Sequence, residues 1–149
     1  MSTTLIRNGR IITATDDYVA DVLMQDGVIH TIGRNIQVGE DVAIVDATGL
    51  YVLPGGVDTH VHLENVIGPT ITCDTFASGT KAAAFGGTTT IVDFALQTPT
   101  DSPLAAIARA QRSAESQVAV DFSFHVIITR VDEQVLQDVR YAMRHEGVT

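Results

Sequence analysis

Residues 86–94 read Gly-Gly-Thr-Thr-Thr-Ile-Val-Asp-Phe, and this stretch decides the predicted fold. The β-branched and apolar run Thr88–Phe94 is typical of a strand that is covered on both faces. The glycine pair before it predicts the end of a helix over Thr72–Phe85, with Thr72 or Asp74 near its N-cap. The chain is therefore expected to pass from a helix into a buried strand, as in proteins built from repeated βα units.

Two similar strands flank this stretch, over Val57–Leu63 and Val120–Ile128, so that strand starts at 57, 88 and 120 follow one another at nearly equal intervals. Ser102-Pro103 is expected to open a helix that runs to about Gln117. Asp132 is expected to cap a further helix that ends at Gly147, with Leu136, Val139 and Met143 on its buried side. Repeated βα units predict a parallel sheet, and a (β/α)₈ TIM-type barrel takes roughly 250 residues. We therefore expect the N-terminal part of such a barrel, incomplete in this chain. A doubly wound open sheet is the alternative, but the first strand is not followed by the Gly-x-Gly-x-x-Gly that dinucleotide-binding sheets of that kind carry.

Residues 1–53 are predicted to form a small antiparallel β domain, and residues 54–149 the first three βα units. Asn8-Gly9 and Asp26-Gly27 lie between apolar segments. Both dipeptides favour two-residue hairpins, because their turn positions need positive φ.

Composition excludes some classes of partner. Eighteen acidic residues against nine basic ones give a formal charge of -9, which argues against nucleic acid. No apolar run approaches the roughly 18 residues that span a bilayer. The single cysteine, Cys73, and an N-terminus without signal-peptide features indicate a cytoplasmic protein.

Metal binding is expected on the first strand of the βα units, Val57–Leu63, at His60 and His62. On a strand, alternate side chains share a face, so Asp58, His60 and His62 point together, away from Val57, Val61 and Leu63. Two imidazoles near the C-terminal end of a barrel strand suit one zinc ion. Asp58 has two open roles: orienting a ligand histidine or accepting from the backbone.

The stretch 53–62, Leu-Pro-Gly-Gly-Val-Asp-Thr-His-Val-His, resembles the hallmark of the amidohydrolase superfamily. Residues 85–94, Phe-Gly-Gly-Thr-Thr-Thr-Ile-Val-Asp-Phe, 121–125, Asp-Phe-Ser-Phe-His, and 145–149, His-Glu-Gly-Val-Thr, narrow the resemblance to hydantoinases and dihydropyrimidinases. It extends over the whole chain.

The resemblance implies a site with two zinc ions, in which His60 and His62 bind the more buried one. A bridging carboxylated lysine, two more histidines and a catalytic aspartate are expected beyond Thr149, so no catalytic residue is assigned here. A hydroxide between the metals would attack a ring amide of a hydantoin or dihydropyrimidine, as in pyrimidine catabolism. The family also implies a homo-oligomer, a tetramer. The alternatives are a dihydropyrimidinase-related assembly protein without catalysis and an allantoinase- or dihydroorotase-like cyclic amidase.

Other residues complete the hypothesis. Asn65, Val66 and Ile67 stand where relatives often carry an apolar triplet, and they are expected to shape substrate choice. Asp93, at the end of the second strand, could act behind the ligands, although a structural hydrogen bond is favoured. His125 is expected to be a hydrogen-bonded core histidine. The isolated chain is expected to be inactive.

Overall fold

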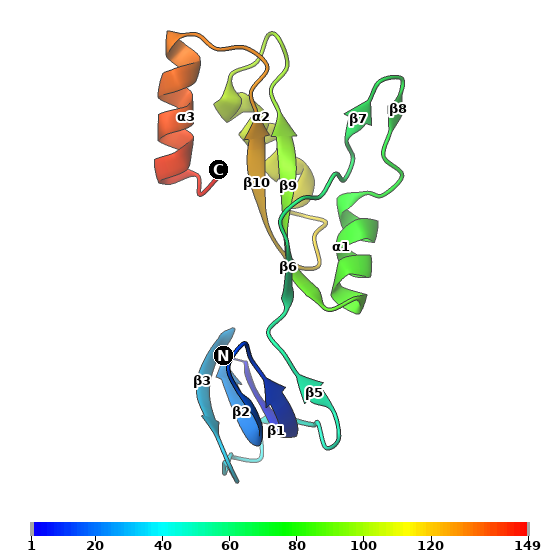
Figure 1. Ribbon diagram of the computed structural model, residues 1–149, viewed down its shortest axis with the longest axis vertical. Helices are drawn as coiled ribbons and strands as arrows, with labels where there is room; N and C mark the ends of the chain where they lie inside the picture. Colours follow the sequence, from blue (N-terminus) through cyan, green and yellow to red (C-terminus); the bar gives the residue numbers. More distant parts are fainter. Residues whose placement is uncertain (1, 149) are drawn as a thin grey trace. The chain divides into compact units, whose positions relative to one another are not determined.

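The computed structural model describes residues 2–148. These residues form two compact units that divide between Pro54 and Gly55 (Figure 1). Each unit has its own sheet. Among the described residues, no helix is both long and apolar enough to cross a membrane.

The first unit is a five-stranded mixed sheet of β1 (Thr3–Ile12), β2 (Asp17–Gln25), β3 (Val28–Gly33), β4 (Ala43–Asp46) and β5 (Tyr51–Val52). β1, β2 and β3 are antiparallel neighbours, but β4 and β5 both pair with β1 in parallel. The predicted small antiparallel β domain is therefore confirmed for β1, β2 and β3 and wrong for β4 and β5. The segment between β3 and β4 carries the chain back along the sheet, so that β4 runs in the direction of β1.

The prediction of a hairpin at Asn8-Gly9 is also wrong, because β1 continues through this dipeptide. The register shifts between Ile6 and Gly9, and Asn8 has a φ of 61°. The positive φ that Asn-Gly favours is thus used in a β-bulge. The Asn8 N–H donates to Asp21 Oδ1 at 2.9 Å and the Ile36 N–H to Asp21 Oδ2 at 3.0 Å. These donors lower the pKa of the buried Asp21 below its ordinary value.

The Asp26-Gly27 hairpin is confirmed. Gln25 pairs with Val28 across it, and Asp26 and Gly27 have φ values of 49° and 80°. These values fit the type of two-residue turn that matches the twist of the flanking strands.

The second unit carries three parallel strands, β6 (Gly56–Asp58), β9 (Thr88–Leu96) and β10 (Asp121–Ile127), in the order β10-β9-β6. Helix α1 (Phe76–Phe85) lies between β6 and β9 in the chain, α2 (Pro103–Ala114) between β9 and β10, and α3 (Glu133–His145) after β10. Consecutive βα strands are therefore neighbours, as predicted. A short hairpin, β7 (Val66–Ile67) and β8 (Thr70–Ile71), was not predicted.

Helix boundaries follow the local capping chemistry. Ser102 and Asp132 cap α2 and α3 as expected, each accepting a backbone N–H within the first turn. Helix α1 begins later than predicted, because Thr75 and Ser78 form a reciprocal capping box. Its predicted end at the glycine pair is confirmed by the C-cap at Gly86.

The core of the second unit lies between the sheet and its helices, and it is built from Phe76, Ala95, Ala106, Ile107, Ala114, Phe124, Ala142 and Val148. β9 alternates: Ile91, Asp93 and Ala95 are buried, while the residues between them are partly exposed. Burial of both faces of β9 is therefore not seen. In α3 the buried residues are Val135, Asp138 and Ala142, whereas Leu136 and Met143 of the predicted face are exposed, because the core meets α3 beside Ala142.

Candidate metal centre

His60 and His62 lie just beyond the C-terminal end of β6, in an extended segment. The predicted strand to Leu63 is too long, since β6 ends at Asp58. The segment still follows β9, because the Val61 N–H donates to the Val92 carbonyl at 3.2 Å. The alternation of side chains persists, and the Nε2 atoms of the two histidines are 3.2 Å apart.

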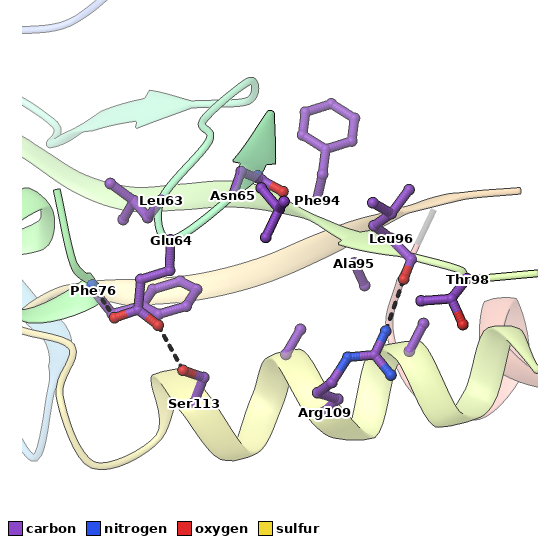
Figure 2. Close-up of a pocket in the computed structure, with 13 residues that line it drawn as sticks. Leu63, Glu64, Asn65, Phe76, Phe94, Ala95, Leu96, Thr98, Arg109 and Ser113 are labelled. Atoms are coloured by element: carbon purple, nitrogen blue, oxygen red, sulfur yellow. Dashed lines mark hydrogen bonds between the residues drawn. The ribbon is translucent and has the colours of Figure 1, made fainter. Parts of the chain in front are cut away.

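The Phe94 ring packs against both histidine rings. Its centroid is 4.7 Å from each imidazole, and the His62 ring stacks on it at an interplanar angle of 21°. Figure 2 shows Phe94 pointing away from α2, whereas Ala95 points toward that helix. The imidazoles therefore lie on the sheet face opposite α2, and Leu63 packs against the core. This is the division of faces that the sequence predicted.

Asp93 holds the backbone that follows the histidines. Its carboxylate is buried and accepts the Leu63 N–H at 2.9 Å and the Phe94 N–H at 2.6 Å. Burial raises the pKa of Asp93 above its ordinary value, while the two backbone donors act in the opposite direction. The Asp93 carboxylate thus holds the backbone that follows His62 against β9.

Asn65 turns its side chain toward His62. Its Nδ2 is 3.1 Å from His62 Nδ1 and 3.4 Å from Asp93 Oδ1. From the sequence, Asn65 was expected only in a substrate loop. The contact with His62 was missed because the preceding residue, Glu64, has a positive φ of 52°, a conformation that the sequence indicates only where a glycine stands.

Glu64 joins the segment to two helices (Figure 2). Its Oε1 accepts the Phe76 N–H at 3.1 Å, at the start of α1, and its Oε2 accepts from the Ser113 hydroxyl of α2 at 2.7 Å. A carboxylate suits the first turn of a helix, whose N–H groups lack partners in the helix. Sequence reasoning did not single out Glu64. Gly79 lets α1 approach, since any Cβ there would overlap the Leu63 side chain.

Asp58 and His125 hold the backbone around the histidines. Asp58 Oδ1 accepts the His60 N–H at 3.1 Å, the second of its two open roles. His125 Nε2 lies 3.0 Å from the Thr59 carbonyl, with its ring 5.1 Å from Phe94. The expected hydrogen bond of His125 is confirmed, but its place in the core is not, because His125 is only partly buried.

The predicted substrate residues Val66 and Ile67 form β7 and are exposed. A cavity of about 470 Å³ lies beside them, between segment 63–66, β9 and α2 (Figure 2). The Arg109 guanidinium closes one side by donating to the Leu96 carbonyl at 2.8 Å. Neither His60 nor His62 lines this cavity, although Asn65 and Phe94, which contact the histidines, do.

The donor set suits zinc. Two nitrogens at 2.0–2.1 Å from a tetrahedral zinc ion are about 3.3 Å apart, close to the observed 3.2 Å between the two Nε2 atoms. Within residues 2–148, no group of three or more His, Cys, Asp or Glu side chains is placed to hold a metal ion.

Comparisons with known proteins place the chain. The model of the Amidohydrolase family matches residues 51–145. A D-hydantoinase of Geobacillus stearothermophilus is 46% identical over 99% of this chain and 31% of its own length. A dihydropyrimidinase of Dictyostelium discoideum is 39% identical over 98% of the chain and 29% of its own length.

A crystal structure of a D-hydantoinase superposes with a TM-score of 0.93 at 43% identity, covering 99% of this chain and 32% of that one. An L-hydantoinase from Arthrobacter aurescens gives 0.75 at 26% identity, covering 99% and 31%. The chain thus spans about a third of the length of the relatives it matches. The resemblance to hydantoinases and dihydropyrimidinases is confirmed, and the chain belongs to the amidohydrolase family.

Proposed function

We propose that this chain is the metal-binding N-terminal part of a zinc-dependent hydrolase that opens the ring amide of hydantoins or dihydropyrimidines. Family membership and the names of the relatives support hydrolysis of cyclic amides. The observation that carries the metal assignment is the 3.2 Å separation of His60 Nε2 and His62 Nε2, a spacing that suits one ion.

In this proposal His60 and His62 hold zinc through Nε2. Zinc in such a site lowers the pKa of water and polarises a carbonyl group. The chain's own task is to hold the two imidazoles in place. Asp58 fixes the His60 backbone, Asp93 fixes the backbone after His62, and Phe94 supports both rings.

The rest of the site is proposed to come from outside these 149 residues. It comprises a bridging carboxylated lysine, two further histidines, a second zinc ion and a catalytic aspartate. The sequential strand order β10-β9-β6 supports a (β/α)₈ barrel as the frame. A cytoplasmic homotetramer remains part of the proposal, and so does the inactivity of the isolated chain.

Two other functions were open from the sequence. A non-catalytic assembly relative would lack the ligands, so the converging histidine pair favours an enzyme. Allantoin-like or dihydroorotate-like rings share the same cyclic amide, and comparing substrates separates them from hydantoins and dihydropyrimidines.

The test uses the full-length protein with His60→Ala and His62→Ala. We expect each variant to lose zinc, measured by elemental analysis, and ring opening of hydantoin and dihydrouracil. His30→Ala is the matched control, because His30 lies on the exposed strand β3 of the other unit. Full zinc occupancy in both single variants would refute the assignment.

The β7–β8 hairpin is proposed to select substrates. Val66 and Ile67 are exposed and lie four and five positions after His62, and loops at this end of a barrel contact substrates. Val66→Ala and Ile67→Ala in the full-length enzyme should change the ratio of kcat/KM for aromatic and small hydantoins. An unchanged ratio would show that the hairpin is not the selector.

A further inference from the structure

We propose that Asn65 is a positioning residue that determines which ring nitrogen of His62 is free to bind the metal. This inference rests on the proposed function, in which His62 is a zinc ligand. It assigns Asn65 a role through His62, separate from the substrate-selecting role of its neighbours Val66 and Ile67.

The His62 ring is held on three sides. One face stacks on Phe94 with centroids 4.7 Å apart, and Nε2 points to His60 Nε2 at 3.2 Å. The remaining nitrogen, Nδ1, meets the Asn65 amide at 3.1 Å. Rotation of the imidazole therefore breaks the contact with Asn65.

Asn65 is itself fixed by its backbone and by Asp93. Its N–H donates to Thr72 Oγ1 at 2.9 Å, and its carbonyl accepts the Thr72 N–H at 2.9 Å. These bonds tie it to the strand that returns through β8. Its Nδ2 lies 3.4 Å from Asp93 Oδ1. The amide is thus held beside His62 by partners that do not bind metal.

The proton on His62 explains why an amide matters here. Neutral imidazole carries one N–H, so binding a cation through Nε2 requires the proton on Nδ1 and an acceptor facing Nδ1. In the structure Nδ2 faces Nδ1. When this NH₂ group donates to Nδ1, the neutral His62 ring carries its proton on Nε2, which faces His60 Nε2.

A half-turn of the Asn65 amide reverses this arrangement. Oδ1 then accepts from Nδ1–H, the proton has moved from Nε2 to Nδ1, and the Nε2 lone pair is free for the cation. No proton is gained or lost by the residue pair. The turn replaces the 3.4 Å contact between Nδ2 and Asp93 Oδ1 by a contact between two oxygen atoms, a cost that metal binding has to offset. An asparagine serves both states because it carries a donor and an acceptor. A leucine of similar size serves neither.

The test compares Asn65→Leu, Asn65→Asp and Val66→Ala in the full-length protein after metal removal. Zinc affinity is measured by chelator competition, and the His62 tautomer by ¹⁵N chemical shifts assigned with His62→Gln. Loss of a partner behind a ligand histidine typically costs about 10–100-fold in metal affinity, the loss expected for N65L. V66A, the matched control for an exposed neighbour, should bind zinc like the wild type.

N65D should bind zinc at least about tenfold more tightly than N65L, because its carboxylate accepts from Nδ1–H; the nearby Asp93 carboxylate limits the recovery. In the metal-free state, the wild type should carry the His62 proton on Nε2 and N65D on Nδ1. Wild-type affinity in N65L, equal weakening in N65L and N65D, or the same tautomer in the wild type and N65D would each overturn the inference. Loss of zinc in His62→Gln with wild-type binding in N65L would leave the proposed function standing, whereas zinc retained in both His60→Ala and His62→Ala would refute that function.

Discussion

Replacing Asp93 with alanine removes the acceptor that holds the histidine segment to β9. The buried carboxylate accepts the Leu63 N–H at 2.9 Å and the Phe94 N–H at 2.6 Å. Phe94 lies within β9, which is also held by pairing with its neighbouring strands, whereas Leu63 lies beyond the end of β6, outside the strand pairing. We therefore expect the variant to keep its fold and to loosen the stretch 59–66.

The size of the effect follows from the bond that is lost. A hydrogen bond to a charged group contributes about 1.5–3 kcal/mol. With about 1.36 kcal/mol for each factor of ten, the Leu63 amide should exchange about 10–150-fold faster with solvent deuterium. Asp93→Asn keeps one acceptor oxygen, and its effect should stay below about tenfold.

Hydrogen exchange measured by mass spectrometry on the full-length protein resolves this change, with peptides that cover 59–66. Asp121→Ala is the matched control, because Asp121 is an exposed carboxylate on the neighbouring strand β10. Faster exchange confined to 59–66 in D93A, absent from D121A, is the expected result. Unchanged exchange of that stretch in folded D93A would refute the role of Asp93 as its anchor.

Two further predictions concern stability, both by urea unfolding of the full-length protein. The Asn8 and Ile36 N–H donors lower the pKa of Asp21 in the folded state, so its contribution to folding stability is present above the ordinary Asp pKa of about 3.9 and is lost as pH falls through the folded value. Asp21→Asn should therefore be less stable than the wild type at pH 7 and equally stable in strong acid. A stability difference that stays constant with pH would contradict this. Ile107→Ala should lower the free energy of unfolding by about 2–5 kcal/mol, because the Ile107 side chain is 1% exposed in the core. Leu136→Ala, on the exposed face of α3, should change that free energy little. Similar losses in both variants would contradict the core assignment.

The sequence predicted the second unit well because its signals are local. Ser102 and Asp132 are N-cap residues that act within one helical turn, and the glycine pair at 86–87 ends α1 next to its own last turn. A strand followed by a helix of this length returns to pair in parallel, so the neighbours of β9 followed from spacing alone. Thr75 was missed as a cap because Ser78, rather than the usual Glu or Gln, completes its capping box.

Long-range pairing explains the errors in the first unit. Asn8-Gly9 has the same local preference as Asp26-Gly27, and both carry positive φ. Only Asp26-Gly27 joins two strands, because Asp21 from β2 holds the Asn8 N–H and the bulge stays inside β1. The parallel pairing of β4 with β1 likewise depends on a connection that no local pattern specifies.

The histidine pair was predictable, but the residues that position it were not, for the same physical reason. Spacing by two residues brings His60 and His62 to one face without any distant partner. A strand continued to Leu63 would have kept that alternation and pointed Asn65 away from His62. Because β6 ends at Asp58 and Glu64 takes a positive φ, the chain turns back and the Asn65 amide reaches His62 Nδ1. The energy that holds this turn comes from Asp93 on β9 and Ser113 on α2, residues 30 and 49 positions away from their partners Leu63 and Glu64. The candidate ligands are therefore found from the sequence alone, whereas the residues that hold them are found only once the later strands and helices are in place.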